Sequence, residues 1–581
     1  MAVVHTKGEP ILHAAGRAGI YMFVGMLVGF FAAFVAIVFV DTVSMLSTFW
    51  LVSDHAKLVS GLSPTVLIFL TILVPSMAGL LVGLMMTYLS PTHKPHGPPD
   101  VIKAVQLGLP LPPLRAGITS SLAALVSLAG GASVGQYAPM VFIGGMVGHL
   151  GSRIGLQLPN FTMVTIGCGV AAAISAAFNA PIAGLIFAHE VILRHYSIQA
   201  FAPITIASTC GYVLSAVILD RPPLLVVKTG LVANSWEFPL FAVLGGCAAL
   251  AAFMLIKAIG FAQKNAGKIS WPLPMKTASA GLVVGCIALW FPEITGVGQL
   301  SLRLATVEGA FTGTDFLILM VGKICLTAFC LGMGFVGGVF SPSLVAGSAL
   351  GGLFWCILTG VIDGGFAPMS FYVVAGMMAL TAPVVGAPLT AIIIVFELTR
   401  NYELTIAAML AVVFSTPLCY RLAGRSFFDL ALLNNGIDLA NGRDQARMAI
   451  TYVHEHLTLD APVVQRTQTT TDVKHIMAQS DWSELFVTEE DGTFYGKLTA
   501  RQILTTHEEQ LPIPLEDNNL VFTKTTSIRD AMLLLEGFVG DAVPVVDETN
   551  QKFLGVVTEA DIIQAYLNIV QQLRDEEHAV L

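Results

Sequence analysis

Three stretches rich in glycine and proline hold the residues best suited to chemistry in this chain. They read GPPD at 97–100, GQYAP at 135–139 and GGVFSPS at 337–343. Proline fits the first turn of a helix, where its missing N–H needs no acceptor, and neighbouring glycines let a ligand approach the backbone. A helix start also carries free N–H groups and about half a positive charge, so it attracts anions. Such stretches can also just break helices and allow tight packing, but three together favour an anion site.

Two of these stretches belong to an internal repeat. The pattern Gly-x3-Pro-x4-Gly-x3-Gly begins at Gly135 and again at Gly338, 203 residues later. An Ala-Pro pair with a glutamate nine residues after the proline ends at Glu190 and again at Glu397, at an offset of 207. Two motifs at nearly the same offset predict two related halves with a site where they meet, as in many transporters.

The composition is that of a polytopic membrane protein. Of the 581 residues, 55% are hydrophobic and 12% are charged, and 55 are glycine, which suits helices packed through small residues. Apolar runs at 20–50 and 66–89 are long enough to span a bilayer. Many later runs are short and interrupted by Gly or Pro, and such broken helices are tolerated only inside a protein or along a cavity. This pattern favours a transport architecture over a simple anchor.

The motifs resemble those of the CLC chloride channels and transporters. GGVFSPS matches the family's GxFxP motif, while GQYAP and PHGPPD (95–100) stand where the family has GREGP and GSGIP. Segments at 389–405 and 424–433 follow in the family's order. The resemblance implies a mostly α-helical membrane protein built from two inverted repeats. It also implies a homodimer in the cell (inner) membrane, with one anion pathway per subunit and a cytosolic α/β pair of CBS domains.

Charge and resemblance together divide the chain into parts. Residues 1–440 carry 15 acidic and 19 basic side chains, whereas 441–581 carry 23 and 10, which marks an acidic soluble tail. The predicted parts are a transmembrane domain at 1–440 with halves at about 14–220 and 235–435, a linker at 441–462, and CBS domains at 463–510 and 515–581.

Two positions depart from what the resemblance implies for proton coupling. The family's external gating acid is replaced by Tyr137, which is flanked by Gln136 and Ala138, and the inner proton acid of exchangers is replaced by Val191. A phenol with a pKa of about 10 is a poor proton carrier at neutral pH. We therefore expect a passive anion channel, modulated by voltage or ligand. A proton-coupled exchanger using another acid is the alternative, and the neighbouring Glu190 is then either that carrier or a structural partner of a helix end.

The resemblance also places an anion site, with further departures. Val339 and Phe340 would offer main-chain N–H groups, His96 stands where the family has Ser, and Phe428 stands where it has Tyr. His96 either donates an N–H to the anion, becoming cationic at low pH, or faces the vestibule without touching the ion. Tyr137 either plugs the pathway or replaces the lost hydroxyl.

The tail repeats one α/β pattern. Residues 463–504 and 520–567 each read strand, helix, strand, strand, helix. The second module carries Thr558 and Asp561, the Thr-x-x-Asp with which many CBS domains hold a ribose, whereas the first has Thr499 and Gln502. The resemblance thus gives two alternatives, an adenine nucleotide site in the second module or a pair of ligand-free modules that stabilise a dimer.

Other classes of function have little support in the sequence. A divalent-cation channel would need acidic rings along its pore. An intramembrane hydrolase would need a dyad such as Ser133 with His149 or His189, and no motif supports one. We expect a protein that is not an enzyme, transports chloride, and requires no cofactor, metal or nucleic acid.

Overall fold

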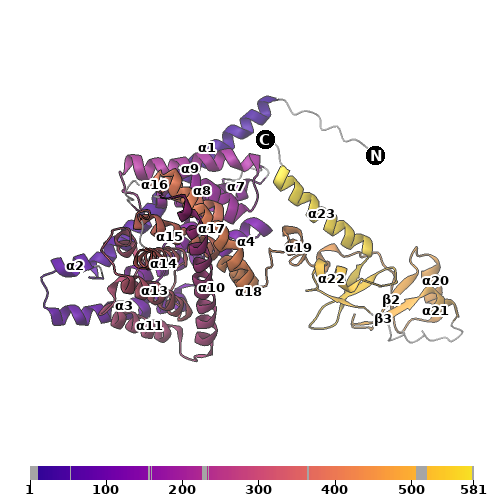
Figure 1. Ribbon diagram of the computed structural model, residues 1–581. Helices are drawn as coiled ribbons and strands as arrows, with labels where there is room; N and C mark the ends of the chain where they lie inside the picture. Colours follow the sequence, from indigo (N-terminus) through magenta and orange to yellow (C-terminus); the bar gives the residue numbers. More distant parts are fainter. Residues whose placement is uncertain are drawn as a thin grey trace. The chain divides into compact units, whose positions relative to one another are not determined.

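The computed structural model describes residues 11–52, 54–154, 158, 160–225, 232, 234–362, 365–505 and 520–578. These residues form two compact units, one up to Leu432 and the other spanning Leu433–His578 (Figure 1). The first unit contains the helices of the predicted membrane domain, and the second contains the six described strands. The division falls close to residue 440, the domain limit expected from the sequence.

Nearly every apolar run becomes a helix, because glycine and proline mark the ends of the runs. The helices of the first half are α1 (Ile11–Phe49), α2 (Asp54–Val59), α3 (Pro64–Leu84), η1 (Met85–Leu89), α4 (Pro98–Leu107), α5 (Leu114–Ala129), α6 (Tyr137–Ser152), α7 (Phe161–Phe178), α8 (Pro181–Phe187), η2 (Ala188–Leu193), α9 (Ile198–Tyr212) and η3 (Val213–Ile218).

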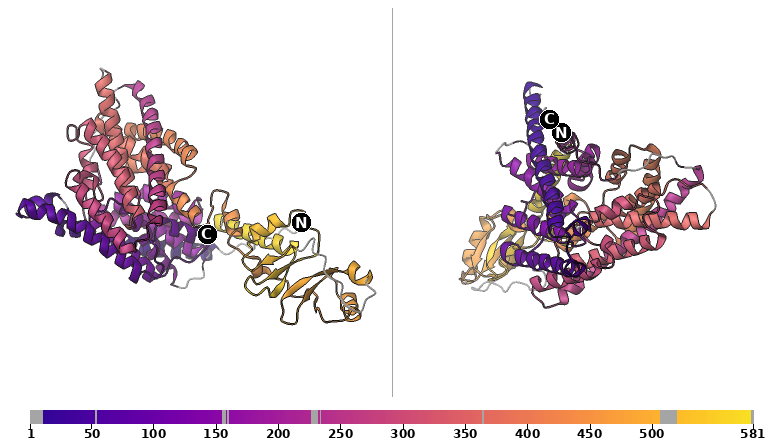
Figure 2. Two further views of the ribbon diagram at one scale, coloured as in Figure 1. Left: turned by 90° about the horizontal axis from the view of Figure 1, so that it is seen from below. Right: turned by 90° about the vertical axis from the view of Figure 1, so that its left-hand side faces the viewer.

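The second half is also almost entirely helical. Its helices are η4 (Ser235–Glu237), α10 (Phe238–Lys268), α11 (Leu273–Ala288), η5 (Pro292–Ile294), α12 (Gln299–Leu304), α13 (Gly313–Gly332), α14 (Phe340–Val361), α15 (Met369–Val385), α16 (Pro388–Thr399), α17 (Tyr402–Ala423) and α18 (Phe427–Asn434). Within the described residues, eight helical segments are long and apolar enough to cross a membrane. Figure 2 shows these helices gathered into one bundle from two further sides.

The repeat found in the sequence is visible in the packing of glycines. A Cβ on Gly144 of α6 would lie 2.5 Å from the Gly169 carbonyl oxygen of α7. In the second half, a Cβ on Gly347 of α14 would lie 2.6 Å from the Gly376 carbonyl oxygen of α15. Both distances are too short for a side chain. Each half therefore depends on glycine to bring one pair of helices, α6 with α7 or α14 with α15, into backbone contact.

The tail contains the two predicted α/β modules. The first has β1 (Val463–Gln465), α20 (Thr470–Ala478), β2 (Glu484–Thr488), β3 (Phe494–Thr499) and α21 (Ala500–Thr505); the second has β4 (Phe522–Thr523), α22 (Ile528–Leu534), β5 (Val543–Val546), β6 (Phe553–Val557) and α23 (Glu559–His578). In each module the first strand pairs parallel to the second, and the second pairs antiparallel to the third. The parts of the expected domains at 506–519 and 579–581 lie outside the described residues.

The stretch expected to be a linker has a different role. Residues 441–462 contain the helices α19 (Arg443–Met448) and η6 (Val453–His456). Met448 and Val453 are buried in the core of the second module with Phe522 and Val543. This stretch therefore completes the second module, because the module's own short strands leave apolar surface that these side chains cover.

Candidate functional site

The starts of α6 and α14, which lie 203 residues apart in the chain, meet in space. Gly135 and Gly338 pair antiparallel, with N–H to oxygen distances of 2.7 and 2.8 Å. A Cβ on Gly135 would lie 2.9 Å from the Gly338 carbonyl oxygen, so only glycine permits this contact. The Gln136 N–H donates to Ser341 Oγ at 3.2 Å. The predicted meeting of the two halves at their repeated motifs is thus present, and it brings two positively polarised helix ends together.

Three aromatic rings cover this pair of helix starts. Tyr137 stacks on Phe178 at the end of α7, with ring centroids 4.3 Å apart, and meets the ring of Phe340 edge-on at 5.2 Å. Phe178 and Phe340 lie 5.5 Å apart. Tyr137 is 2% exposed, so its ring is enclosed by neighbours and does not line an open mouth.

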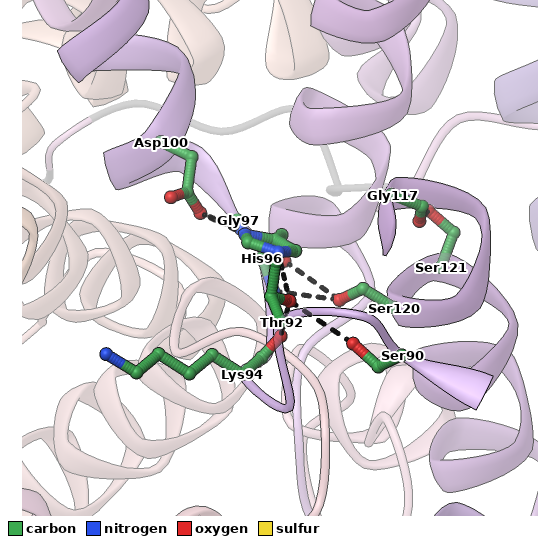
Figure 3. Close-up of polar contacts among 9 residues, drawn as sticks. All are labelled: Ser90, Thr92, Lys94, His96, Gly97, Asp100, Gly117, Ser120 and Ser121. Atoms are coloured by element: carbon green, nitrogen blue, oxygen red, sulfur yellow. Dashed lines mark hydrogen bonds and ion pairs between the residues drawn. The ribbon is translucent and has the colours of Figure 1, made fainter. Parts of the chain in front are cut away.

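The start of α4 is a hydrogen-bonded loop centred on His96 (Figure 3). The ring Nδ1 lies 3.2 Å from Asp100 Oδ2 and the ring Nε2 lies 2.9 Å from Thr92 Oγ1. The His96 main-chain N–H donates to Ser120 Oγ at 2.8 Å. The Gly97 N–H donates to Asp100 Oδ2 at 3.0 Å, which closes the first turn of the helix. Both ring nitrogens of His96 therefore have protein partners.

These contacts bring some of the predicted anion-site residues together. The His96 ring stacks on Phe142 of α6 at 5.9 Å, which joins the α4 start to α6, and Phe340 joins α14 to Tyr137. Val339 is buried directly before α14. Phe428 is buried on α18 beside Phe427, and among the described residues no ring contact or hydrogen bond links it to the other positions. Its role, like that of His96, stays a prediction.

Glu190 caps a helix of the opposite half. Its carboxylate accepts hydrogen bonds from the Leu389 and Thr390 N–H groups, both at 2.8 Å, and from Thr390 Oγ1 at 2.6 Å. Its repeat mate Glu397 accepts from the Ile182 and Ala183 N–H groups at 2.9 and 2.7 Å. Glu190 thus lies at a helix end, as the interpretation of a structural partner requires, and the two caps are exchanged between the halves.

Val191, which the resemblance predicts to replace the inner acid of exchangers, is buried. It lines a cavity of about 370 Å³ together with Glu190, Arg194, Ser426 and Asp429. Arg194 and Asp429 form an ion pair at 2.5 Å, and Ser426 Oγ donates to Asp429 at 2.7 Å. Arg194, Ser426 and Asp429 are thus held by one another, and Val191 contributes an apolar part of the cavity wall.

One buried lysine in the membrane unit belongs to none of the sequence motifs. Lys323 lies in the middle of α13 with no exposed surface, and its Nζ donates to the carbonyl oxygens of Ile294 and Gly296 at 3.0 and 2.7 Å. The signal was present in the sequence, since a lone lysine interrupts the apolar run LILMVGKICLTAF. Ionisable residues inside membrane helices are rare and mark functional sites by default.

In the tail, the predicted nucleotide residues close the start of α23. Asp561 Oδ2 accepts hydrogen bonds from the N–H and Oγ1 of Thr558 at 2.9 and 2.8 Å, and from Thr458 Oγ1 at 2.9 Å. The first module repeats this geometry, with Gln502 Oε1 accepting from the N–H and Oγ1 of Thr499. The Thr-x-x-Asp pattern therefore has a structural role, and its ligand stays a prediction.

Comparisons with known proteins agree with this geometry. Residues 78–419 match the model of the voltage gated chloride channel family, and residues 515–568 match the CBS domain. The chain is 29% identical over 371 residues to a ClcB-like chloride channel protein of Ralstonia nicotianae, covering 63% of this chain and 86% of that one. It is 25% identical over 405 residues to the voltage-gated ClC-type chloride channel ClcB of Escherichia coli, covering 68% and 94%.

Solved structures share the fold. A slow cyanobacterial Cl−/H+ antiporter matches with a TM-score of 0.64 and 20% identity, covering 71% of this chain and 97% of its own. A eukaryotic CLC transporter matches with a TM-score of 0.62 and 18% identity, covering 93% and 97%. Paired helix starts, several apolar spans and these matches lead to one conclusion: the chain is a multi-pass membrane protein of the CLC family of chloride channels and transporters, followed by a CBS tail.

Proposed function

We propose that this protein is a passive anion channel, with chloride as its ion, in which transport is not coupled to protons. The observation that carries the proposal is the bonding of Glu190. This glutamate is the sole carboxylate in the sequence between Asp100 and Asp220. Both of its oxygens accept hydrogen bonds from the start of α16.

A proton carrier must gain and lose its proton during each cycle. Protonation of Glu190 would remove an acceptor from N–H groups at a helix start, where a negative charge is favoured. If Tyr137 and Val191 stand at the two acid positions of exchangers, neither of these positions offers a carboxylate that could cycle. This reasoning favours a channel over the alternative, a proton-coupled exchanger using a different acid.

Chloride would bind beside the joined starts of α6 and α14. The first N–H groups of each helix have no acceptor within the helix, and the two ends add their positive polarisation. Val339 and Phe340 supply such groups from α14, and the enclosed ring of Tyr137 stands at the gate. Because the Tyr137 ring is buried and packed against Phe178 and Phe340, we favour steric obstruction by the ring over coordination of the ion.

The remaining features of the proposal follow from family membership. The protein would act as a homodimer in the cell membrane, with its CBS tail on the cytoplasmic side. The tail would modulate the channel, with adenine nucleotide as the ligand of the second module near Thr558 and Asp561.

Simultaneous recording of chloride and proton movement tests this function. The purified protein in liposomes should release chloride down its gradient whenever charge is balanced by a potassium ionophore. The chloride gradient should not drive proton uptake, so the external pH should stay constant. Uphill proton movement that disappears without chloride would reject the channel and establish the exchanger.

A further inference from the structure

Lys323 stands out among the groups that the proposed mechanism leaves unused. Its side chain is wholly buried in α13, and among the described residues no carboxylate lies within 4 Å of its ammonium group. Two backbone carbonyls accept two of its three N–H bonds. A buried charge is costly unless it is paired, so a negative partner nearby would favour the charged form of Lys323.

The position of Lys323 points to that partner. Its Nζ and the Ser133 Oγ donate to the same Ile294 carbonyl oxygen, at 3.0 and 3.1 Å. The two groups therefore lie within about 6 Å of each other by hydrogen-bond geometry alone. Ser133 lies two residues before Gly135, the residue that joins the starts of α6 and α14.

Gly298 lies between the ammonium group of Lys323 and α14. A Cβ built on Gly298 would lie 3.3 Å from Lys323 Nζ and 2.8 Å from Cγ2 of Val345, which is in the second turn of α14. The charge is thus placed between the loop that leads into α6 and the first turns of α14. It lies where the two helix ends already favour an anion.

We propose that Lys323 is a specificity-determining residue whose buried positive charge sets how tightly the pathway holds its anion. This inference rests on the proposed anion conduction and adds a buried lysine, charged when an anion is bound nearby, to the helix ends. Gln136 occupies the place where the family motif has an arginine, and Lys323 would supply positive charge near the same loop. At an effective dielectric constant of about 20, a unit charge about 10 Å away changes affinity by on the order of tenfold.

The test is chloride binding to the full-length, detergent-solubilised protein, measured by calorimetry and repeated as flux in liposomes. Lys323→Met and Lys323→Gln should weaken chloride binding about tenfold and reduce the discrimination among chloride, bromide and nitrate. Lys323→Arg should restore both to within twofold of the unmodified protein. The Gln variant keeps N–H donors for the two carbonyls, so it serves if the Met variant does not fold.

Two matched controls separate charge from structure. Ser133→Ala removes a neutral hydrogen bond to the same Ile294 oxygen, and it should lower the melting temperature without weakening chloride binding. Lys276→Met removes a half-buried lysine that donates to the Ala266 carbonyl in α10, and it should leave binding unchanged. Wild-type affinity and selectivity in both neutral variants, or the same loss in Ser133→Ala, would overturn the proposal. Proton coupling in the unmodified protein would reject the channel mechanism. The effect of Lys323 on chloride binding could still be judged, because binding is measured without transport.

Discussion

Five helices in the membrane unit start in closely related ways, yet they fall into two groups. The starts of α4, α8 and α16 are closed by a carboxylate, from Asp100, Glu397 and Glu190 respectively. The starts of α6 and α14 have no acidic residue in their first turns and are joined to each other through glycine. Aromatic rings cover these two starts.

The difference shows where an anion has room to bind. A carboxylate that accepts the first N–H groups of a helix satisfies the donors and cancels the positive end of the helix dipole. Such a start holds its helix firmly and offers little to a second anion. The starts of α6 and α14 keep their donors and their positive polarisation, and this supports our proposal that the anion binds beside them.

The largest effect is expected at Tyr137, whose ring covers the starts of α6 and α14, the two starts without a carboxylate. Tyr137→Ala should raise chloride flux about tenfold or more, because it removes the ring enclosed between Phe178 and Phe340. Tyr137→Phe should conduct like the unmodified protein, since it keeps the bulk of the ring and loses just the hydroxyl. Chloride efflux from liposomes measures both.

Tyr137→Glu should place a carboxylate at the start of α6, so that this start resembles those of α4, α8 and α16. A carboxylate competes with chloride for the helix end, and a protonated carboxyl does not. Flux should therefore be low at neutral pH and rise as pH falls towards the ordinary glutamate pKa of about 4.3. Wild-type flux across pH 4–8 in the Glu, Ala and Phe variants alike would mean that Tyr137 does not line the pathway.

Removing a closing carboxylate should cost stability and leave transport coupling unaltered. Glu190→Gln loses a charge that accepts three hydrogen bonds at the start of α16, worth about 1–3 kcal/mol. Glu397→Gln is the matched variant in the other half and should cost a similar amount. Thermal melting in detergent measures both. Loss of chloride-driven proton movement in Glu190→Gln alone would identify Glu190 as a proton carrier instead.

A smaller effect is expected when the carboxylate at the start of α4 is neutralised, which makes this start more like those of α6 and α14. Asp100→Asn leaves the fold of the loop in place but removes the negative charge beside His96 and Gly97. The helix end should then attract anions more strongly, and the half-saturating chloride concentration should fall about twofold to threefold. Thr92→Val, which removes the other ring partner of His96 without altering charge, should leave that concentration unchanged.

Much of the fold could be predicted because glycine and proline mark the helix ends in the sequence. The equal spacing of Glu190 and Glu397 from their prolines also indicated a structural role at a helix end. The sequence could not show that each glutamate caps the other half's helix, because that contact joins residues about 200 positions apart. The short helix α12 and the folded stretch at 441–462 were missed, because packing of a few side chains, and no periodic pattern, forms them.

The site was harder to predict than the fold. The motif at 95–100 placed His96 near an anion, but its ring partners depend on how the loop from Thr92 to Asp100 folds back on itself. The enclosure of Tyr137 depends on Phe178, which belongs to no motif. Lys323 was visible in the sequence as a charge in an apolar run, and its importance became clear from the Ile294 oxygen that it shares with Ser133.

The smallest effect is expected in the tail, where a carboxylate also closes a helix start. Asp561 accepts a hydrogen bond from the N–H of Thr558, three residues earlier, as Asp100 does from Gly97 at the start of α4. Asp561→Ala should lower the stability of the second module by about 1 kcal/mol, the usual worth of such a cap. Chloride flux without nucleotide should not change.

If adenine nucleotide binds in this module, calorimetry on the full-length protein should detect heat with ATP or AMP and a weaker response in Asp561→Ala. Gln502→Ala provides the matched change in the first module and should leave that heat unaltered. An equal nucleotide response in all three proteins would show that Asp561 acts as a cap and nothing more.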